Sequence, residues 1–300
     1  MDLKRIWITI SSKWRILLIV LAPAAMLCTL AVMLIPGPVA SDDGRADLTG
    51  VDFSHNQLVS LNGQWEFYWN KLLTPEDFSF AQKPQPDSFM NVPGVWSDRS
   101  GTDYTHQGVA TYRMVLRYPA ALKDPALRIQ NVATAYKLYA NGRLVSEVGN
   151  ASDDKAAFRE AEQTRIIDLP KDAQEIALVI QAANLNYATG GLRAGPVFGS
   201  KQVLEQQKMI LLVLQTLFIG GVFIFGLHYF AQFLLHNKNK PALFFSLLCI
   251  ITVLRSLLWG ETPLMIFFPD ASFDFRMYLN YLTGYNYVPI VILFVHGVYP

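Results

Sequence analysis

The feature that most constrains this chain is an uncharged run at residues 209–235, MILLVLQTLFIGGVFIFGLHYFAQFLL. About 20 apolar residues in a helix cross a hydrocarbon core about 30 Å thick. The run therefore predicts a transmembrane helix. The composition agrees, because 52% of the residues are hydrophobic and only 16% are charged, which is unusual for a purely soluble protein.

Similar runs predict two more spans, at residues 241–259 and 278–298, and an N-terminal anchor at residues 16–35 within a segment of residues 1–40. Basic residues precede the anchor: Lys4, Arg5, Lys13 and Arg15. Since basic flanks stay in the cytoplasm, the N-terminus is predicted to be cytoplasmic. A cleaved signal peptide is the alternative, although its apolar region is usually only about 7–15 residues long.

This orientation places residues 41–208 outside the cytoplasm and the basic loop with Lys238 and Lys240 inside. Residues 201–300 are then the first three helices of a bundle, and the lipid bilayer is a predicted partner. Aromatic residues cluster near the expected outer surface: Trp259, Phe267, Phe268, Tyr278, Tyr281, Tyr285 and Tyr287. The sequence stops directly after an apolar stretch, so further spans and a cytoplasmic module are expected beyond it.

Residues 41–200 have the character of a separate, soluble domain with short strands. In ATYRMVLRYP, Tyr112, Met114 and Leu116 share one face, which predicts a half-buried strand. In AYKLYANGRLVSEV, Asn141-Gly142 predicts a tight β-hairpin. Residues 151–163 are predicted to be a long loop or a short helix. Several short strands without long helices between them predict an all-β sandwich.

The stretch LNGQWEFYW at residues 61–69 is either an aromatic belt at a membrane surface or the first strand of this sandwich. Its neighbours favour the strand. NVPGVWSD, GVATYRMVLRYP, the Asn-Gly hairpin and ALVIQAANLN follow it in order. Together they resemble the jelly-roll sugar-binding domain of the glycoside hydrolase family 2 enzymes, over most of residues 61–184. The resemblance implies that Trp65 and Phe67 fill the sandwich core.

In that family the hydrolase chemistry lies in a separate barrel domain, whereas apolar helices follow here. The resemblance therefore implies a fold and a carbohydrate ligand, not catalysis. The complete order of anchor, jelly roll and helices resembles the bacterial seven-transmembrane receptors with diverse intracellular signalling modules. Their outputs include histidine kinases and diguanylate cyclases, but this sequence contains no signature of either.

Catalytic, metal and cofactor signatures are not found in the sequence. Residues 41–200 contain no cysteine, which excludes disulfides and Cys-based metal sites there. The acidic pairs Asp153-Asp154 and Glu160-Glu162 are interpreted as solvated loop residues. We therefore predict that residues 1–300 are not an enzyme and bind no cofactor. The net charge of +1 indicates no nucleic-acid partner.

A small ligand, with carbohydrate as the first candidate, is predicted instead. Sugar sites combine aromatic faces with polar side chains, and suitable residues lie on the expected loops: Trp96, Tyr104, Asn184, Asn186, Tyr187 and Arg193. Trp96 is equally compatible with the core. The segment from Asn184 to Arg193 is equally compatible with a loop that docks the sandwich onto the helices. Arg255 either reaches the membrane surface or pairs with Glu261 or another span.

The leading hypothesis is thus the sensory part of a transmembrane receptor that passes ligand binding to a cytoplasmic output module. A membrane-anchored glycan-processing enzyme and a non-signalling scaffold are the alternatives. A homodimer is compatible with the sequence.

Overall fold

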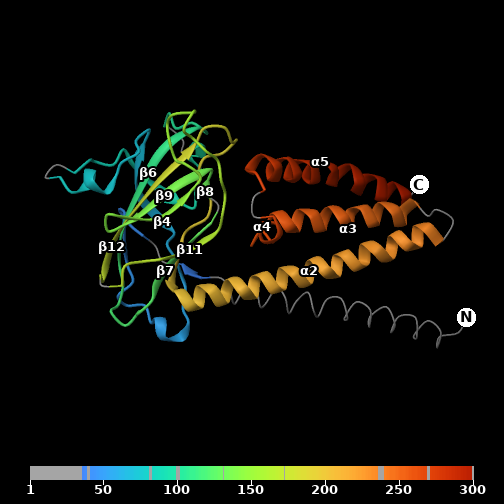
Figure 1. The fold of residues 1–300 in the computed structure, drawn as a ribbon, viewed down its shortest axis with the longest axis horizontal. Coiled ribbons are helices and arrows are strands. Elements are labelled where there is room, and N and C mark those ends of the chain that lie inside the picture. The colour runs from blue at the N-terminus through green and yellow to red at the C-terminus, as the bar shows by residue number, and fades with distance from the viewer. Residues whose placement is uncertain are drawn as a thin grey trace, which may run out of the picture. The chain divides into compact units, whose positions relative to one another are not determined.

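A computed structural model describes residues 36–38, 41–80, 83–98, 102–130, 132–171, 173–235, 240–268 and 271–298 (Figure 1). The chain divides into two compact units, 1–35 and 36–300, and every described residue belongs to the second. The predicted anchor at 16–35 and the loop residue Lys238 lie outside the described residues.

The second unit begins with a β-rich domain. One sheet has the order β10 (Arg143–Val148), β9 (Ala135–Ala140), β12 (Glu175–Asn184), β6 (Gly108–Arg117), β4 (Gly63–Trp69), β5 (Ser88–Val92), with β2 (Arg45–Asp47) also paired to β6. The other has the order β1 (Gly37–Pro38), β3 (Val59–Ser60), β14 (Val197–Ser200), β7 (Pro125–Ile129), β11 (Arg165–Asp168). A small pair joins β13 (Gly191–Leu192) to β8 (Val132–Ala133). Short 3₁₀ helices span Phe53–His55, Pro75–Phe78 and Trp96–Asp98.

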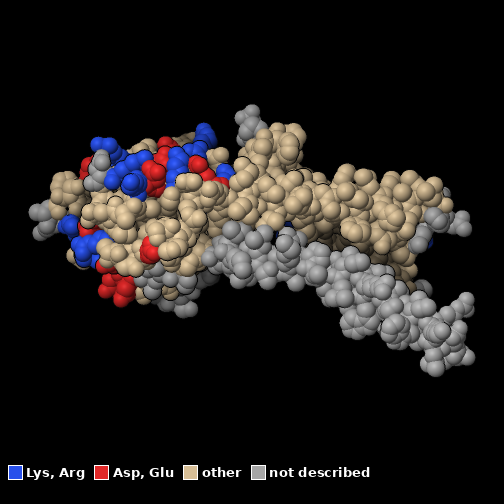
Figure 2. Space-filling model, turned by 90° about the horizontal axis from the view of Figure 1, so that it is seen from below, with Lys and Arg blue, Asp and Glu red and all other residues tan. Residues whose placement is uncertain are grey.

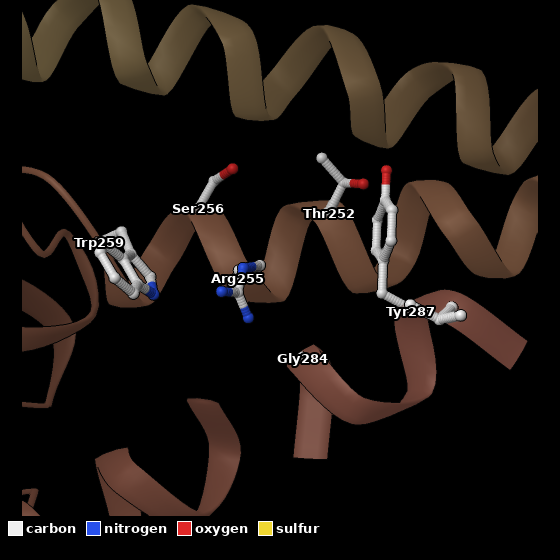
Figure 3. A pocket seen from close by; sticks show the side chains of 7 residues that line it. Thr252, Arg255, Ser256, Trp259, Gly284 and Tyr287 are labelled. Atoms are coloured by element: carbon white, nitrogen blue, oxygen red, sulfur yellow. The ribbon is translucent and has the colours of Figure 1, made fainter. Parts of the chain in front are cut away.

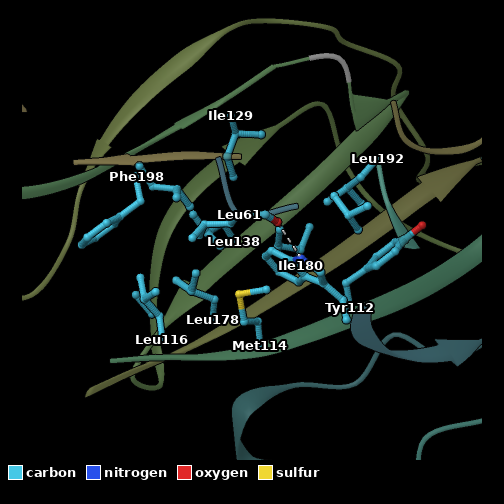
Figure 4. Packing of buried hydrophobic residues seen from close by; sticks show 14 of the residues in the cluster. Leu61, Tyr112, Met114, Leu116, Ile129, Leu138, Leu178, Ile180, Leu192 and Phe198 are labelled. Atoms are coloured by element: carbon cyan, nitrogen blue, oxygen red, sulfur yellow. Dashed lines mark hydrogen bonds between the residues drawn. The ribbon is translucent and has the colours of Figure 1, made fainter. Parts of the chain in front are cut away.

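The two large sheets form the predicted sandwich, since one apolar cluster takes side chains from both. Met114 on β6 and Leu178 on β12 lie in the same cluster as Phe198 on β14 (Figure 4). Most strand pairs are antiparallel, and β1–β3 and β2–β6 are parallel. The alternation predicted for β6 is confirmed from Tyr112 to Arg117, where the fully buried Tyr112, Met114 and Leu116 alternate with the less buried Arg113, Val115 and Arg117.

Two local predictions for the sandwich are also confirmed. Trp65 and Phe67 on β4 are fully buried in the core, and Trp65 Nε1 donates a hydrogen bond to the Leu61 carbonyl at 3.1 Å. Asn141 and Gly142 join β9 to β10 with φ angles of 46° and 84°, the left-handed conformation that a tight hairpin turn needs. Residues 151–163 form a loop whose described backbone contains no helix.

The rest of the unit is helical: α2 (Lys201–Leu235), α3 (Lys240–Leu258), the short α4 (Leu264–Phe267) and α5 (Phe273–Val298). Three of these, α2, α3 and α5, are long and apolar enough to cross a membrane. Helix α3 packs against both α2 and α5 (Figure 1). On the face shown in Figure 2, charged side chains gather over the sandwich and the helices are almost free of them.

Two helix boundaries differ from the predicted spans. Helix α2 begins at Lys201, so the polar stretch LEQQK at 204–208 continues the apolar span as one helix, as its sequence predicts, whereas α5 begins at Phe273 rather than at 278. The length of an apolar run predicts only the part of a helix that lies within a bilayer. It does not predict polar turns at the end of the helix that pack on a neighbouring domain. The early turns of both helices make such contacts, as described below.

Replacing Trp65 with alanine tests the core. We expect Trp65→Ala to lower the free energy of unfolding by about 3–5 kcal/mol, because it leaves a large cavity and removes a buried hydrogen bond. Thermal unfolding of the detergent-solubilised chain, followed by near-ultraviolet circular dichroism, measures the change. The control is Phe80→Ala, whose side chain is 65% exposed and whose loss should change stability by less than about 0.5 kcal/mol. Equal effects of the two variants would contradict this assignment of the core.

Candidate functional site

The sandwich continues into the helices without a linker. Strand β14 ends at Ser200 and α2 begins at Lys201. The Lys201 backbone N–H donates to the Asp124 carbonyl at 2.9 Å, and its Nζ donates to Asp168 Oδ2 at 2.9 Å. Leu204, one turn further, is fully buried in a small apolar cluster with Leu58, Ala126 and Val197. The first turn of α2 is therefore fixed to the five-stranded sheet.

A buried ion pair makes the second connection. Arg128 lies on β7, and Glu261 lies between α3 and α4; their side chains are only 6% and 4% exposed. Arg128 Nη2 donates to Glu261 Oε1, and Arg128 Nη1 donates to Gln207 Oε1 on α2 at 3.3 Å. Buried charges are stable only when they are paired. Removal of either Arg128 or Glu261 would therefore leave the charge of the other buried and unpaired.

Glu162 makes the third connection, from the loop before β11 to α5. Its Oε1 accepts from Arg193 Nη2 at 2.8 Å, and its Oε2 accepts from Arg276 Nη2 at 3.2 Å. Arg276 Nη1 also donates to the Glu162 carbonyl at 3.0 Å. The interpretation of Glu162 as a solvated loop residue is therefore wrong, because its side chain is only 18% exposed and lies between two guanidinium groups.

Aromatic contacts flank this ion cluster. The ring centroids of Tyr187 and Phe273 lie 6.1 Å apart in an edge-to-face arrangement. The Arg193 guanidinium lies 5.4 Å from the Tyr187 ring centroid, and that of Arg276 lies 5.7 Å from the Phe273 ring centroid. The segment from Asn184 to Arg193 thus contacts α5, which is what the docking interpretation of that segment expects.

A cavity of about 500 Å³ lies between the sandwich and the helices. Its lining comes from sandwich loops and from α3 and α5, and it includes Glu162, Tyr187, Arg193, Trp259, Arg276 and Asn280. This size is in the range of small-molecule sites, about 300–1,000 Å³. Of the six predicted ligand residues, the structure brings Tyr187 and Arg193 together here.

The other four predicted residues lie elsewhere. Trp96 is a core residue with no exposed surface, and its Nε1 donates to the Tyr112 hydroxyl at 2.8 Å. Burial raises the pKa of the Tyr112 hydroxyl, because it disfavours the charged phenolate. Trp96 therefore cannot present a flat face to a sugar, which corrects the use of Trp96 as a ligand platform.

Asn184 is also fully buried, and its side chain shapes the loop instead. Its Nδ2 donates to the carbonyls of His106 and Tyr187 at 2.8 and 3.0 Å, and its Oδ1 accepts from the Tyr187 N–H at 3.0 Å. Asn184 is therefore corrected from a ligand contact to a residue that positions Tyr187. Tyr104 packs against the core and donates to Ser88 Oγ at 3.1 Å, and Asn186 is exposed.

A second cavity, of about 520 Å³, lies between α3 and α5 and includes Arg255, Trp259, Gly284 and Tyr287 in its lining (Figure 3). The Arg255 guanidinium lies 5.5 Å from the Trp259 ring centroid. A Cβ at Gly284 would lie 3.0 Å from Arg255 Nη1, so glycine leaves room for this side chain. The suggested pairing of Arg255 with Glu261 is wrong, because Glu261 pairs with Arg128.

Arg128 is not among the residues predicted from the sequence, although the strand around it contains a signal. Arg128 is the only charged residue in the apolar strand PALRI, and every residue of that strand is buried. A charge in such a strand indicates a buried partner. The identity of the partner was not readable, because Glu261 lies 133 residues away. Among the described residues, no group of three or more His, Cys, Asp or Glu side chains is suited to hold a metal ion.

No protein-family model and no curated protein matches this chain. Among solved structures, similar ones include a β-glucuronidase of an uncultured Clostridium species, with 17% identity, a TM-score of 0.36, and coverage of 48% of this chain and 29% of that one. A β-glucuronidase of Ruminococcus gnavus has 18% identity and a TM-score of 0.38, covering 48% and 28%. A putative β-galactosidase of Bacteroides fragilis has 16% identity and a TM-score of 0.33, covering 47% and 23%.

The chain thus spans less than a third of the length of these glycoside hydrolases. At such low identity and TM-score the match carries no argument about activity.

The buried ion pair gives a quantitative test of the contact. We expect Glu261→Gln to destabilise the solubilised chain by about 3–5 kcal/mol, since it leaves the Arg128 charge buried and unpaired. The double replacement Arg128→Met with Glu261→Leu should recover most of this loss, because no charge is then buried. Thermal unfolding measures all variants.

The control for this test is Lys171→Met, which breaks an exposed ion pair with Asp124 and should have little effect. A loss for Glu261→Gln no larger than that for Lys171→Met would show that Arg128 and Glu261 are not paired in a buried contact.

Proposed function

We propose that this chain is the sensory part of a transmembrane signalling receptor. The sandwich lies outside the cytoplasm and binds a small ligand, with carbohydrate as the first candidate. Helices α2, α3 and α5 cross the membrane and pass the signal to a cytoplasmic output module, such as a histidine kinase or a diguanylate cyclase. The resemblance to the seven-transmembrane receptors is the source of the proposed output.

The observation that carries this proposal is the threefold attachment of the sandwich to the helices. Strand β14 runs directly into α2, Arg128 pairs with Glu261 beside α3, and Glu162 pairs with Arg276 on α5. A ligand shifts a conformational equilibrium only through the difference between its affinities for the two states. A receptor therefore needs contacts that make the position of the helices differ between the ligand-bound and the ligand-free state of the sandwich. A domain on a flexible tether would lose this coupling.

An enzyme and a passive scaffold remain the alternatives to a sensor. Neither requires charged side chains to be buried between the sandwich and the helices, where each buried charge carries a desolvation cost. The geometry therefore favours the sensor.

Labelling of single cysteines in intact cells tests the topology. With both native cysteines replaced by alanine, we introduce Lys155→Cys in the exposed loop before β11 or Lys240→Cys at the start of α3. We expect a membrane-impermeant maleimide to label Lys155→Cys in intact cells and Lys240→Cys only after permeabilisation, since a bilayer blocks the charged reagent. Labelling of Lys240→Cys alone in intact cells would reverse the proposed orientation.

Hydrogen–deuterium exchange tests the mechanical link. We expect Arg276→Gln on α5 to speed exchange both in the first turns of α5 and in the sandwich loop around Glu162, because the variant removes the charge that Glu162 contacts across the interface. The control Lys171→Gln should leave both regions unchanged. A change confined to α5 would show that the sandwich and the helix do not respond together.

A further inference from the structure

The cavity between the sandwich and the helices has the composition of a ligand site. Its described lining contains two arginines, Arg193 and Arg276, and one acidic residue, Glu162. The three side chains therefore leave one positive charge without a negative counterpart in the described lining. A monoanionic ligand would balance this charge, whereas a neutral ligand would not.

Arg193 also has an unused hydrogen-bond donor. Its Nη2 is bound to Glu162, but its Nε is buried and has no hydrogen-bond partner within the described part of the chain. A buried donor without a partner costs free energy, which an acceptor that reaches Nε would offset. Guanidinium groups bind carboxylates with particularly good geometry. The ligand group that best matches the two arginines of the lining is therefore a carboxylate.

The rest of the lining suits the body of a sugar. Tyr187 and Trp259 supply aromatic rings, which favour the apolar faces of a pyranose ring. Gln130, Thr164 and Asn280 supply side chains that donate to and accept from hydroxyl groups. The cavity volume of about 500 Å³ leaves room for one monosaccharide and water.

We infer that this cavity binds a small sugar acid, a monosaccharide with one carboxylate, held by Arg193 and Arg276 and contacted by Tyr187 and Trp259. This inference rests on the proposed sensory role and names its ligand class and location. Because the lining belongs to both the sandwich and the helices, such a ligand stabilises the docked arrangement of the two. The ligand is therefore recognised at the same place where the signal enters the helices.

Binding of galacturonate to the full chain in lipid nanodiscs tests the inference, with galactose as the matched ligand that lacks the carboxylate. Intrinsic tryptophan fluorescence and titration calorimetry measure binding. We expect galacturonate to saturate and galactose to bind at least about tenfold more weakly, because charge-assisted hydrogen bonds to the carboxylate are lost. Equal affinities, or no saturable binding of galacturonate, would overturn the assignment.

Two variants locate the site. Arg193→Gln should weaken galacturonate binding by about tenfold or more, with little effect on galactose. The matched control Arg143→Gln, on the exposed β9–β10 hairpin, should bind galacturonate normally. Trp259→Phe should keep binding in calorimetry and remove most of the fluorescence change. Equal losses in Arg193→Gln and Arg143→Gln would place the ligand elsewhere. Unfolding temperatures of both arginine variants, measured in parallel, detect a folding defect.

The outcomes separate this site from the proposed function. If Arg276→Gln alters exchange on both sides of the contact but galacturonate does not bind, the coupling stands and this ligand assignment fails. If galacturonate binds as expected but the exchange effect stays within α5, the site stands and the sensory coupling fails.

Discussion

The need to neutralise buried charge determines how the sandwich and the helices fit together. Arg128 lies in a strand whose residues are all buried, so its charge cannot reach water and must find an anion inside the protein. Glu261 supplies it from the corner between α3 and α4. A shift of the sheet against this corner by even one residue would separate the pair and leave both charges uncompensated. The contact therefore has one favourable register.

Two further connections restrict the same contact. The first turn of α2 is held to the sheet by hydrogen bonds from Lys201 and by burial of Leu204, and Glu162 holds the first turns of α5 through Arg276. Each of the three long helices is thus attached near one end. A helix is stiff along its axis, so a displacement at its attached end moves the whole helix. A movement of β14 would thus act on α2, one of β7 on the corner after α3, and one of the loop at Glu162 on α5.

The features that the sequence predicted correctly are all local. The alternation in β6, the Asn141-Gly142 turn and the uncharged run in α2 are each visible within a short window. The site was predictable only in part, because Glu162 and Arg276 are 114 residues apart and nothing local marks them as partners. Aromatic residues were misleading for a similar reason. Trp96 and Tyr187 both follow strands, and only the tertiary structure places one in the core and the other at the helix contact.

Trp259 and Asn280 connect the contact between the sandwich and the helices to the pairing of α3 with α5. Trp259 Nε1 donates to Asn280 Oδ1 at 2.9 Å, which joins the end of α3 to α5. Both residues line the cavity at the sandwich, and Trp259 also lines the cavity around Arg255. The Arg255 guanidinium approaches the Trp259 ring and the Asn280 carbonyl. An occupant of the first cavity would therefore touch the side chains that hold α3 against α5. Its effect on that pairing is limited to its difference in affinity between the two arrangements. A lining shared by the sandwich and the helices allows such a difference, because a change in their arrangement changes the site itself.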